Sequence, residues 1–391
     1  MDLAFKRART AVTVAFIVNG FVVGAFVARL PDFKEILGIS DGEIGRSIVF
    51  SSIGLLLGLA PVGRLSAKLG SSRVAIPASI ALALSTTLVG FSHSVFQFSA
   101  SLFLFGLLLG AQDVAMNAHA VVVEHGMNKR IMSTFHATFS SGALAGSLIG
   151  GALSQWNVSI QAHTIGVGFF SITATLLTQR WWLPAETDIH PIEKHEKSRS
   201  RKRPAIFWAL GLIVMCGQVG EGAAGDWGGI LSRGAFNASP FISTLPFIFF
   251  SITMVTGRFL GDRLASRFGA RRLIITGGLV SGIGLTTGLV VGGIGGVIFG
   301  WIFLAAGSSI VLPLIFSIAG SLAKNRFADR MAPAEGMAMV SGIAYFGFLA
   351  GPPVIGFLAD QISLRWAMLL PAFLALFIAL GSYLAIQKED A

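Results

Sequence analysis

The sequence predicts an all-α integral membrane protein with twelve transmembrane helices in two pseudo-symmetric six-helix halves. Of the 391 residues, 53% are apolar and 12% are charged, whereas soluble domains carry about 25% charged residues. About twenty mainly apolar residues cross a bilayer as a helix, and the chain contains twelve such segments. Two stretches of the first half also recur in the second half at nearly the same spacing, which indicates an internal duplication.

The twelve segments are centred near residues 19, 53, 83, 110, 142, 173, 216, 252, 283, 309, 346 and 376. Lys6, Arg7 and Arg9 precede the first one as in a signal peptide, but it leads straight into another segment, so we expect a retained helix. Most of the 29 Lys and Arg residues fall on one side of the predicted membrane. The positive-inside rule then places both termini in the cytoplasm, and we expect a bacterial inner membrane.

The net charge of +10 is spread over many short loops, which argues against a nucleic-acid partner. The longest polar stretch, residues 184–204, separates the halves. We therefore expect an N-terminal half over 1–184, a cytoplasmic linker over 185–204 and a C-terminal half over 205–391. The basic end of the linker, KSRSRKR, is either an orientation signal or a contact for anionic lipid.

Two pairs of sequences carry the duplication. GLAPVGRLSAKLGSSRV (58–74) aligns without gaps on GRFLGDRLASRFGARRL (257–273). GALAGSLIGG (142–151) aligns on GFLAGPPVIG (347–356). We expect the glycines of the second pair to permit close helix packing.

These repeats, with the segment number and the linker position, resemble the major facilitator superfamily. The first pair is similar to its cytoplasmic loop motif, and QDVAMNAHAV followed by IMSTFHATFSSGALAG resembles its bacterial MosC-like subgroup. The resemblance implies the major facilitator fold, with helices 1, 4, 7 and 10 lining a cavity and helices 3, 6, 9 and 12 facing lipid. It also implies a cytoplasmic gate motif at Arg64, Lys68, Gly70, Arg73, Asp262, Arg263, Arg267, Gly269 and Arg272.

The motif departs from the superfamily pattern at its acid. Ala67 and Ser266 stand where the loop normally has an aspartate, and Asp262, one turn earlier, is a possible substitute. Gly106 and Ser147 also replace the arginine and proline typical of drug antiporters. The sequence therefore leaves open what holds the first loop.

The fourth segment carries an acid near its middle. Asp113 costs about 3 kcal/mol to insert, and the Leu, Phe and Val residues around it, each worth about −0.5 kcal/mol, outweigh that cost. Gly106, Gly110, Asp113, Asn117, Ala120 and Glu124 form one helical stripe, which should face protein or water. Asp113 with Asn117 either binds substrate or a proton or makes a structural hydrogen bond. We expect His119, off the stripe, to pack, and Glu124 to contact a loop or gate.

Other polar groups fall on the helices that the resemblance places around the cavity. We expect Gln218 and Glu221 to share a face of the seventh segment, whose six glycines between Gly217 and Gly229 predict a bent or unwound outer end. Asp226 is either a site residue or the partner of Arg233, and Arg29 with Asp32 predicts an outer-end salt bridge. Trp227 and Tyr345 are candidates for a stacking wall. The candidate site is Asn19, Asp113, Asn117, His136, Ser140, Gln218, Glu221, Asp226, Trp227 and Tyr345.

The sequence thus predicts a secondary active transporter for a small polar organic solute, working by alternating access of two rocking halves. The coupling hypothesis is a proton on Asp113 or Glu221. Two alternatives stay open, namely proton-driven efflux of amphipathic drugs and a non-transporting membrane sensor of the same fold. The chain has no phosphate-binding loop and no evident nucleophile or metal cluster, so we expect no enzyme activity, metal or cofactor. We also expect the protein to be a monomer.

Overall fold

The computed structural model describes residues 3–129, 131–189, 203–328, 331 and 333–386, without the side chains at positions 60, 262, 333 and 334. The described residues form helices and no strand. Contacts divide the chain into two compact units, residues 1–194 with 239–244, and residues 195–238 with 245–391. Most of the predicted linker, and both chain ends, lie outside the described residues.

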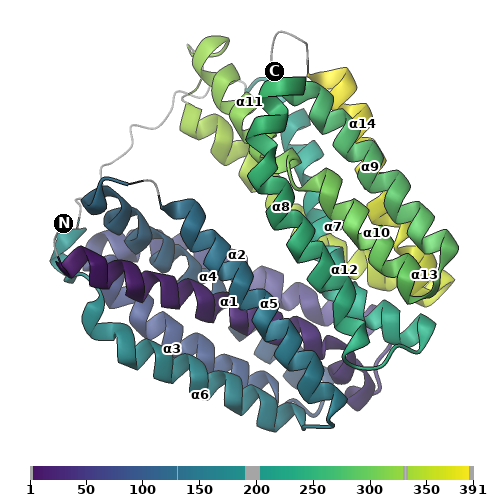
Figure 1. Ribbon diagram of the computed structural model, residues 1–391, viewed down its shortest axis with the longest axis horizontal. Helices are drawn as coiled ribbons and strands as arrows, with labels where there is room; N and C mark the ends of the chain where they lie inside the picture. The colour runs from purple at the N-terminus through teal and green to yellow at the C-terminus, as the bar shows by residue number, and fades with distance from the viewer. Residues whose placement is uncertain (1–2, 130, 190–202, 329–330, 332, 387–391) are drawn as a thin grey trace. The chain divides into compact units, whose positions relative to one another are not determined.

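Within residues 3–189 the first unit contains six long helices and two short 3₁₀ turns (Figure 1). They are α1 (Leu3–Leu37), α2 (Asp41–Leu69), α3 (Ser71–Val89), α4 (Val95–Met127), α5 (Met132–Gln155), α6 (Ile160–Thr178), η1 (Gln179–Trp181) and η2 (Ala185–Thr187).

The remaining helices begin with α7, and a 3₁₀ turn precedes α8. They are α7 (Ala205–Phe236), η3 (Ile242–Thr244), α8 (Leu245–Phe268), α9 (Ala270–Val291), α10 (Gly293–Ser308), α11 (Val311–Asn325), α12 (Pro333–Ile362), α13 (Leu364–Ala367) and α14 (Leu369–Ala385). Eleven helical stretches of the described chain are long and apolar enough to cross a membrane. The 24-residue α5 is also long enough, but its serines and glycines lower its mean hydropathy.

Side chains cap the helices where the loops are polar. Ser40 and Glu43 form a capping box at the start of α2, and Ser94 and Ser159 cap α4 and α6. At α5 the cap comes from a neighbouring helix, since Glu124 Oε2 accepts from the N–H groups of Ile131 (2.6 Å) and Met132 (2.8 Å). The predicted loop contact of Glu124 is therefore confirmed, and its negative charge also suits a helix N-terminus.

Glycines bring α1 and α5 into backbone contact. A Cβ on Gly24 would lie 2.0 Å from the Ala143 carbonyl oxygen, and one on Gly142 would lie 2.1 Å from that of Ile17. Gly20 and Gly146 meet the partner helix equally closely. The predicted packing role of the α5 glycines is confirmed, because only a residue without Cβ allows this approach.

The predicted irregular outer end of the seventh helix is wrong. α7 runs unbroken from Ala205 to Phe236, because a helix in lipid satisfies its own backbone groups. Bulky side chains pack against its glycines: the Trp301 indole lies against Gly228, and the Phe348 ring lies against Gly222. The about 1 kcal/mol that each glycine costs relative to alanine is therefore not enough to unwind it.

The break occurs in the tenth membrane segment, at Ser309 and Ile310 between α10 and α11. Pro313 follows it; proline lacks the N–H that would bond to the Ser309 carbonyl, and its ring crowds that oxygen. Gly257 of α8 lies against this break, where an added Cβ would lie 2.1 Å from Ser309 Oγ.

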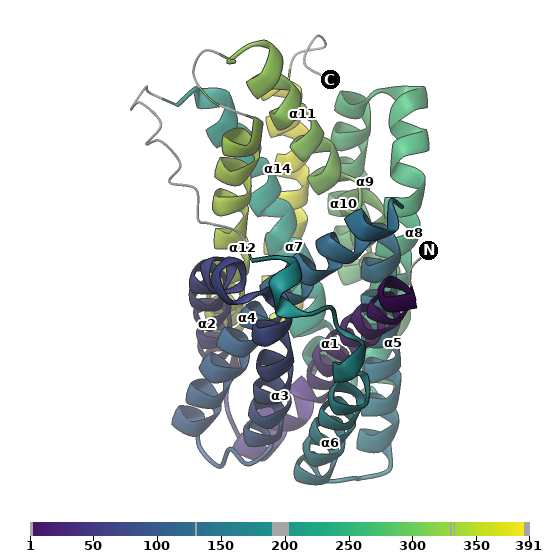
Figure 2. The same ribbon diagram turned by 90° about the vertical axis from the view of Figure 1, so that its left-hand side faces the viewer.

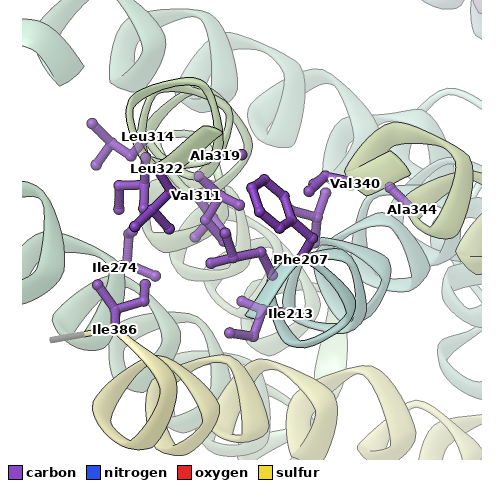
Figure 3. Close-up of a cluster of buried hydrophobic side chains, with 14 of the residues drawn as sticks. Phe207, Ile213, Ile274, Val311, Leu314, Ala319, Leu322, Val340, Ala344 and Ile386 are labelled. Carbon is purple, nitrogen blue, oxygen red and sulfur yellow. The ribbon is translucent and has the colours of Figure 1, made fainter. Parts of the chain in front are cut away.

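Each unit has a buried apolar interior and apolar outer faces. Figure 3 shows part of the second interior, where side chains of α7, α9, α11 and α12 meet Ile386. In the first unit α3 and α6 lie side by side (Figure 2), and Phe169 and Leu177 of α6 are more than 70% exposed. Val291 of α9 and Leu384 of α14 are equally exposed. Such faces suit lipid contact, as predicted for the third, sixth, ninth and twelfth membrane segments, which contain α3, α6, α9 and α14.

Candidate functional site

Asp113 and Asn117 form a polar pair within α4. The Asn117 side-chain amide donates to the Asp113 carbonyl oxygen (2.9 Å) and to its carboxylate Oδ1 (3.1 Å). Both side chains are partly buried. The amide donor holds the carboxylate in one rotamer, while the remaining exposure leaves the pair open to a solute or a proton.

The rest of the predicted stripe on α4 packs against protein. A Cβ on Gly106 would lie 1.9 Å from the Ser51 carbonyl oxygen of α2, and one on Gly110 would lie 2.5 Å from that of Leu55. Ala120 is fully buried. The stripe therefore avoids lipid, as expected, but only Asp113 and Asn117 near its middle are candidates to line a cavity.

Asn19, a candidate site residue, is buried against α4 in the structure, and its role stays a prediction. Its amide donates to the Gln112 side-chain oxygen of α4, and both residues are only 2% exposed. Gln112 also donates to Met116 Sδ (3.4 Å). The Asn19–Gln112 contact joins α1 to α4 and satisfies two buried amides. Sequence reasoning missed Gln112, although its place beside Asp113 in an apolar helix was a usable signal.

His136 and Ser140 lie one turn apart on α5. The exposed His136 ring stands edge-on to Phe16 of α1, with centroids 5.3 Å apart. Ser140 Oγ donates to the His136 carbonyl oxygen (3.2 Å). The serine is thus engaged with its own helix, while the imidazole remains accessible.

Gln218 and Glu221 lie on adjacent turns of α7, and both are partly buried. Glu221 Oε1 accepts from Arg258 of α8 at 3.3 Å, with side chains 31% and 44% exposed. Arg258 is a functional candidate that sequence reasoning missed. The signal was present, since Arg258 interrupts the apolar part of α8 ten residues before its end.

Trp227 and Tyr345 do not form one stacking wall. Gly211 of α7 meets Ile343 of α12, and Gly351 of α12 meets Val219, so the two helices run parallel in register. Trp227 then lies about 20 Å farther along the helix axis than Tyr345. Trp227 is also fully buried, whereas Tyr345 is 39% exposed.

Asp226 directly precedes Trp227 on α7 and is partly buried. It lies about one turn beyond Glu221, toward the outer end of the helix. Its role stays a prediction.

In the first unit, the loop of the predicted gate motif is the turn between α2 and α3 at Gly70. Two acids in the segment that follows α6 hold this loop. The carboxylate of Asp188 accepts from the Ser71 N–H (3.1 and 3.2 Å), and Glu186 pairs with Arg73 (2.5 Å). Gly70, at φ 88°, brings the turn against the Ala185 carbonyl. Asp188 therefore caps the start of α3, in a loop where Ala67 stands in place of the usual aspartate. Arg64 and Lys68 are exposed.

The loop of the second predicted gate motif, between α8 and α9, is held by the C-terminal end of α14 and the residue that follows it. Arg271 donates to the carbonyl oxygens of Ile386 (2.6 Å) and Tyr383 (2.8 Å). Gly269 repeats the positive φ of Gly70, at 82°. The other basic residues of this copy, Arg263, Arg267 and Arg272, are exposed. Asp262 lies in α8, but its side chain is outside the described part, so its substitute role stays a prediction.

His119 is buried between the first gate loop and the end of α6. The Leu183 N–H donates to its Nε2 (3.2 Å), so Nδ1 carries the hydrogen and donates to Ser71 Oγ (2.7 Å). The ring also packs on Trp182, with centroids 4.6 Å apart. The predicted packing role is confirmed.

Replacing His119 with alanine is expected to destabilise the protein by about 3 kcal/mol, since two buried hydrogen bonds and a ring contact are lost. Thermal melting of the detergent-purified protein measures this. His125→Ala is the matched control, because His125 is exposed near the end of the same helix. Equal melting temperatures for the two variants would contradict the role given to His119.

The predicted salt bridge near the C-terminal end of α1 is confirmed. Arg29 Nε lies 2.5 Å from Asp32 Oδ2, with side chains only 4% and 10% exposed. Ser154 of α5 donates to Asp32 (2.9 Å), and Arg29 donates to the Val158 carbonyl (2.7 Å). The pair is structural, since it ties α1 to α5 and to the following loop.

Among the described residues, no three His, Cys, Asp or Glu side chains gather into a metal site. Two groups of partly exposed polar side chains lie together in membrane helices, namely Asp113 with Asn117 in one unit and Gln218 with Glu221 and Arg258 in the other.

The sequence profile of the Major Facilitator Superfamily matches residues 12–232 and 225–390. Membrane protein MosC of Rhizobium meliloti is 28% identical over 377 residues, covering 96% of this chain and 90% of MosC. An uncharacterised MFS-type transporter of Yersinia pestis is 27% identical over 373 residues, covering 94% and 92%. The nucleoside transporter NupG has the same fold, with a TM-score of 0.76 at 12% identity over 99% of this chain and 100% of NupG.

Proposed function

Because the chain belongs to the major facilitator superfamily, we propose that it moves a small polar organic solute by alternating access, coupled to a proton. It is a multi-pass membrane transporter and not an enzyme. The proposal places it in a bacterial inner membrane, as a monomer with both termini in the cytoplasm.

One observation carries the proposal, namely that Asp113 and Glu221 are partly exposed in the middle of membrane helices. Each lies about 20 Å from the nearer end of its helix. A carboxylate at this depth is expensive to face toward lipid, so it faces protein or water. The structural pair Arg29–Asp32 is almost completely buried. Asp113 and Glu221 are partly exposed instead, which supports exchange of these two acids with a proton or a polar solute.

A thermal-shift panel tests this proposal with the purified protein. Sugars, polyols, amino acids, carboxylates and amphipathic drugs are compared between pH 5 and 8. We expect a polar solute to raise the melting temperature of wild type and of the exposed control Arg46→Gln, and to lose its effect in Asp113→Asn. Stabilisation by drugs alone, or unchanged stabilisation in Asp113→Asn, would contradict the proposed polar site.

A further inference from the structure

Two ion pairs of this chain differ in geometry. Arg29 and Asp32 are 2.5 Å apart and nearly buried. Arg258 and Glu221 are 3.3 Å apart, joined through one nitrogen and one oxygen, and 44% and 31% exposed. A long single contact with both partners accessible is weak. The second pair can therefore open without breaking the packing of its helices.

Arg258 has donors to spare. A guanidinium carries five N–H groups in a planar fork, and the described side chains engage Arg258 only through Nη2 to Glu221. The fork is therefore available for a second, better-aligned acceptor.

The existing partner indicates what that acceptor is. Glu221 already presents a carboxylate to Arg258, and two parallel hydrogen bonds between a guanidinium and a carboxylate are stronger than one. Resting on the transport function proposed above, we infer that Arg258 binds the carboxylate group of the transported solute. Glu221 is the internal counter-ion that this carboxylate displaces.

The surroundings make Glu221 the group that takes up the balancing proton. Among the helices packed on α7, α10 carries no ionisable residue, α12 brings only Tyr345 outside its end turns, α11 only Lys324 near its end, and α13 only Arg365. On α14, the only ionisable group is Tyr383 near its end. Asp226 follows on α7 itself, and Asp262 on α8 one turn beyond Arg258. Protonation of Glu221 releases Arg258, so a proton and an organic anion enter the site together without net charge.

Counterflow in proteoliposomes tests the inference with matched solutes. Labelled gluconate is compared with glucose, and lactate with propane-1,2-diol, because each pair differs by one carboxylate. We expect exchange of a carboxylate and not of its neutral partner. Arg258→Gln should lower that exchange about 10- to 100-fold, the value of hydrogen bonds to a charged group. Arg258→Lys should exchange the carboxylate at a rate between those of wild type and Arg258→Gln. Arg46→Gln, at an exposed position near the start of α2, should exchange it at the wild-type rate.

The pH dependence separates binding from mere support of the fold. Wild type should bind the carboxylate more tightly at pH 5 than at pH 8, and Glu221→Gln should bind equally tightly at both. Exchange of neutral solutes without any carboxylate would overturn the inference while leaving the transport proposal intact. A pH dependence that persists in Glu221→Gln and disappears in Asp262→Asn would overturn it too.

Discussion

Replacing Gly24 with valine is expected to lower the melting temperature of the purified protein by about 10 °C, since overpacking a close helix contact costs about 3 kcal/mol. The added Cβ would lie 2.0 Å from the Ala143 carbonyl oxygen and 2.7 Å from its carbon. Backbone atoms cannot move aside as a side-chain end can, so α1 and α5 must separate. The Ser147 hydroxyl, which bonds to the Gly24 carbonyl at 3.2 Å, would lose its partner as well.

Gly166→Val on α6 is the matched control for this change. A Cβ at Gly166 meets nothing within 4 Å, so the same substitution adds volume without overlap. Melting and size-exclusion profiles of both variants in the same detergent provide the comparison. If Gly24→Val and Gly166→Val have the same melting temperature, α1 and α5 do not make the close backbone contact described.

Replacing Asp113 with asparagine is expected to abolish proton-driven accumulation of the solute found by the thermal-shift panel. One proton per solute and a pH difference of one unit support at most about tenfold accumulation, and this should fall to onefold. Asparagine keeps the size and the contact with Asn117 but cannot take up a proton. Downhill exchange separates two causes: it stops if Asp113 also holds the solute, as the thermal-shift panel predicts, and it continues if Asp113 carries only the proton.

Accumulation and counterflow by the same proteoliposomes separate these roles. Asp41→Asn is the control, because Asp41 lies at the start of α2 and pairs with Lys34 instead of facing a membrane site. Full accumulation in Asp113→Asn would remove Asp113 from the coupling path and leave Glu221, the proton acceptor inferred above, to couple transport alone.

Much of the fold was predictable because it depends on local composition. Apolar length locates the membrane helices, and the repeated glycines at positions 70 and 269 mark equivalent turns with positive φ. The packing role of Gly142 and Gly146 followed from their spacing on one helix face. These features need no knowledge of which helix lies opposite.

The site was less predictable because its contacts depend on how neighbouring helices are rotated. Asn19 and Gln112 were both visible as polar residues, but only the α1–α4 packing pairs them. Arg258 stood within a repeat attributed to the gate, and its meeting with Glu221 depends on the α7–α8 contact. The acids that hold the first gate loop, Glu186 and Asp188, come from a segment that hydropathy marks only as polar.

The failure at α7 has a different cause. Glycine content predicts a weak helix in water, where the backbone can bond to solvent instead. Within a membrane that alternative is missing, and bulky partners such as Trp301 fill the space beside the glycines. The segment with Pro313 does break, between α10 and α11, whereas Pro31, Pro61 and Pro77 lie inside unbroken helices.

Solute-induced proton movement is the decisive measurement of proton-coupled transport through Asp113 and Glu221. Purified protein is placed in liposomes that enclose a pH-sensitive dye, and each polar solute of the panel is added outside without a pre-formed pH gradient. The account predicts that at least one solute changes the internal pH with wild type and not with Asp113→Asn or Glu221→Gln. Solute entry that leaves the internal pH constant, and that proceeds equally in both variants, would contradict proton-coupled transport through these acids.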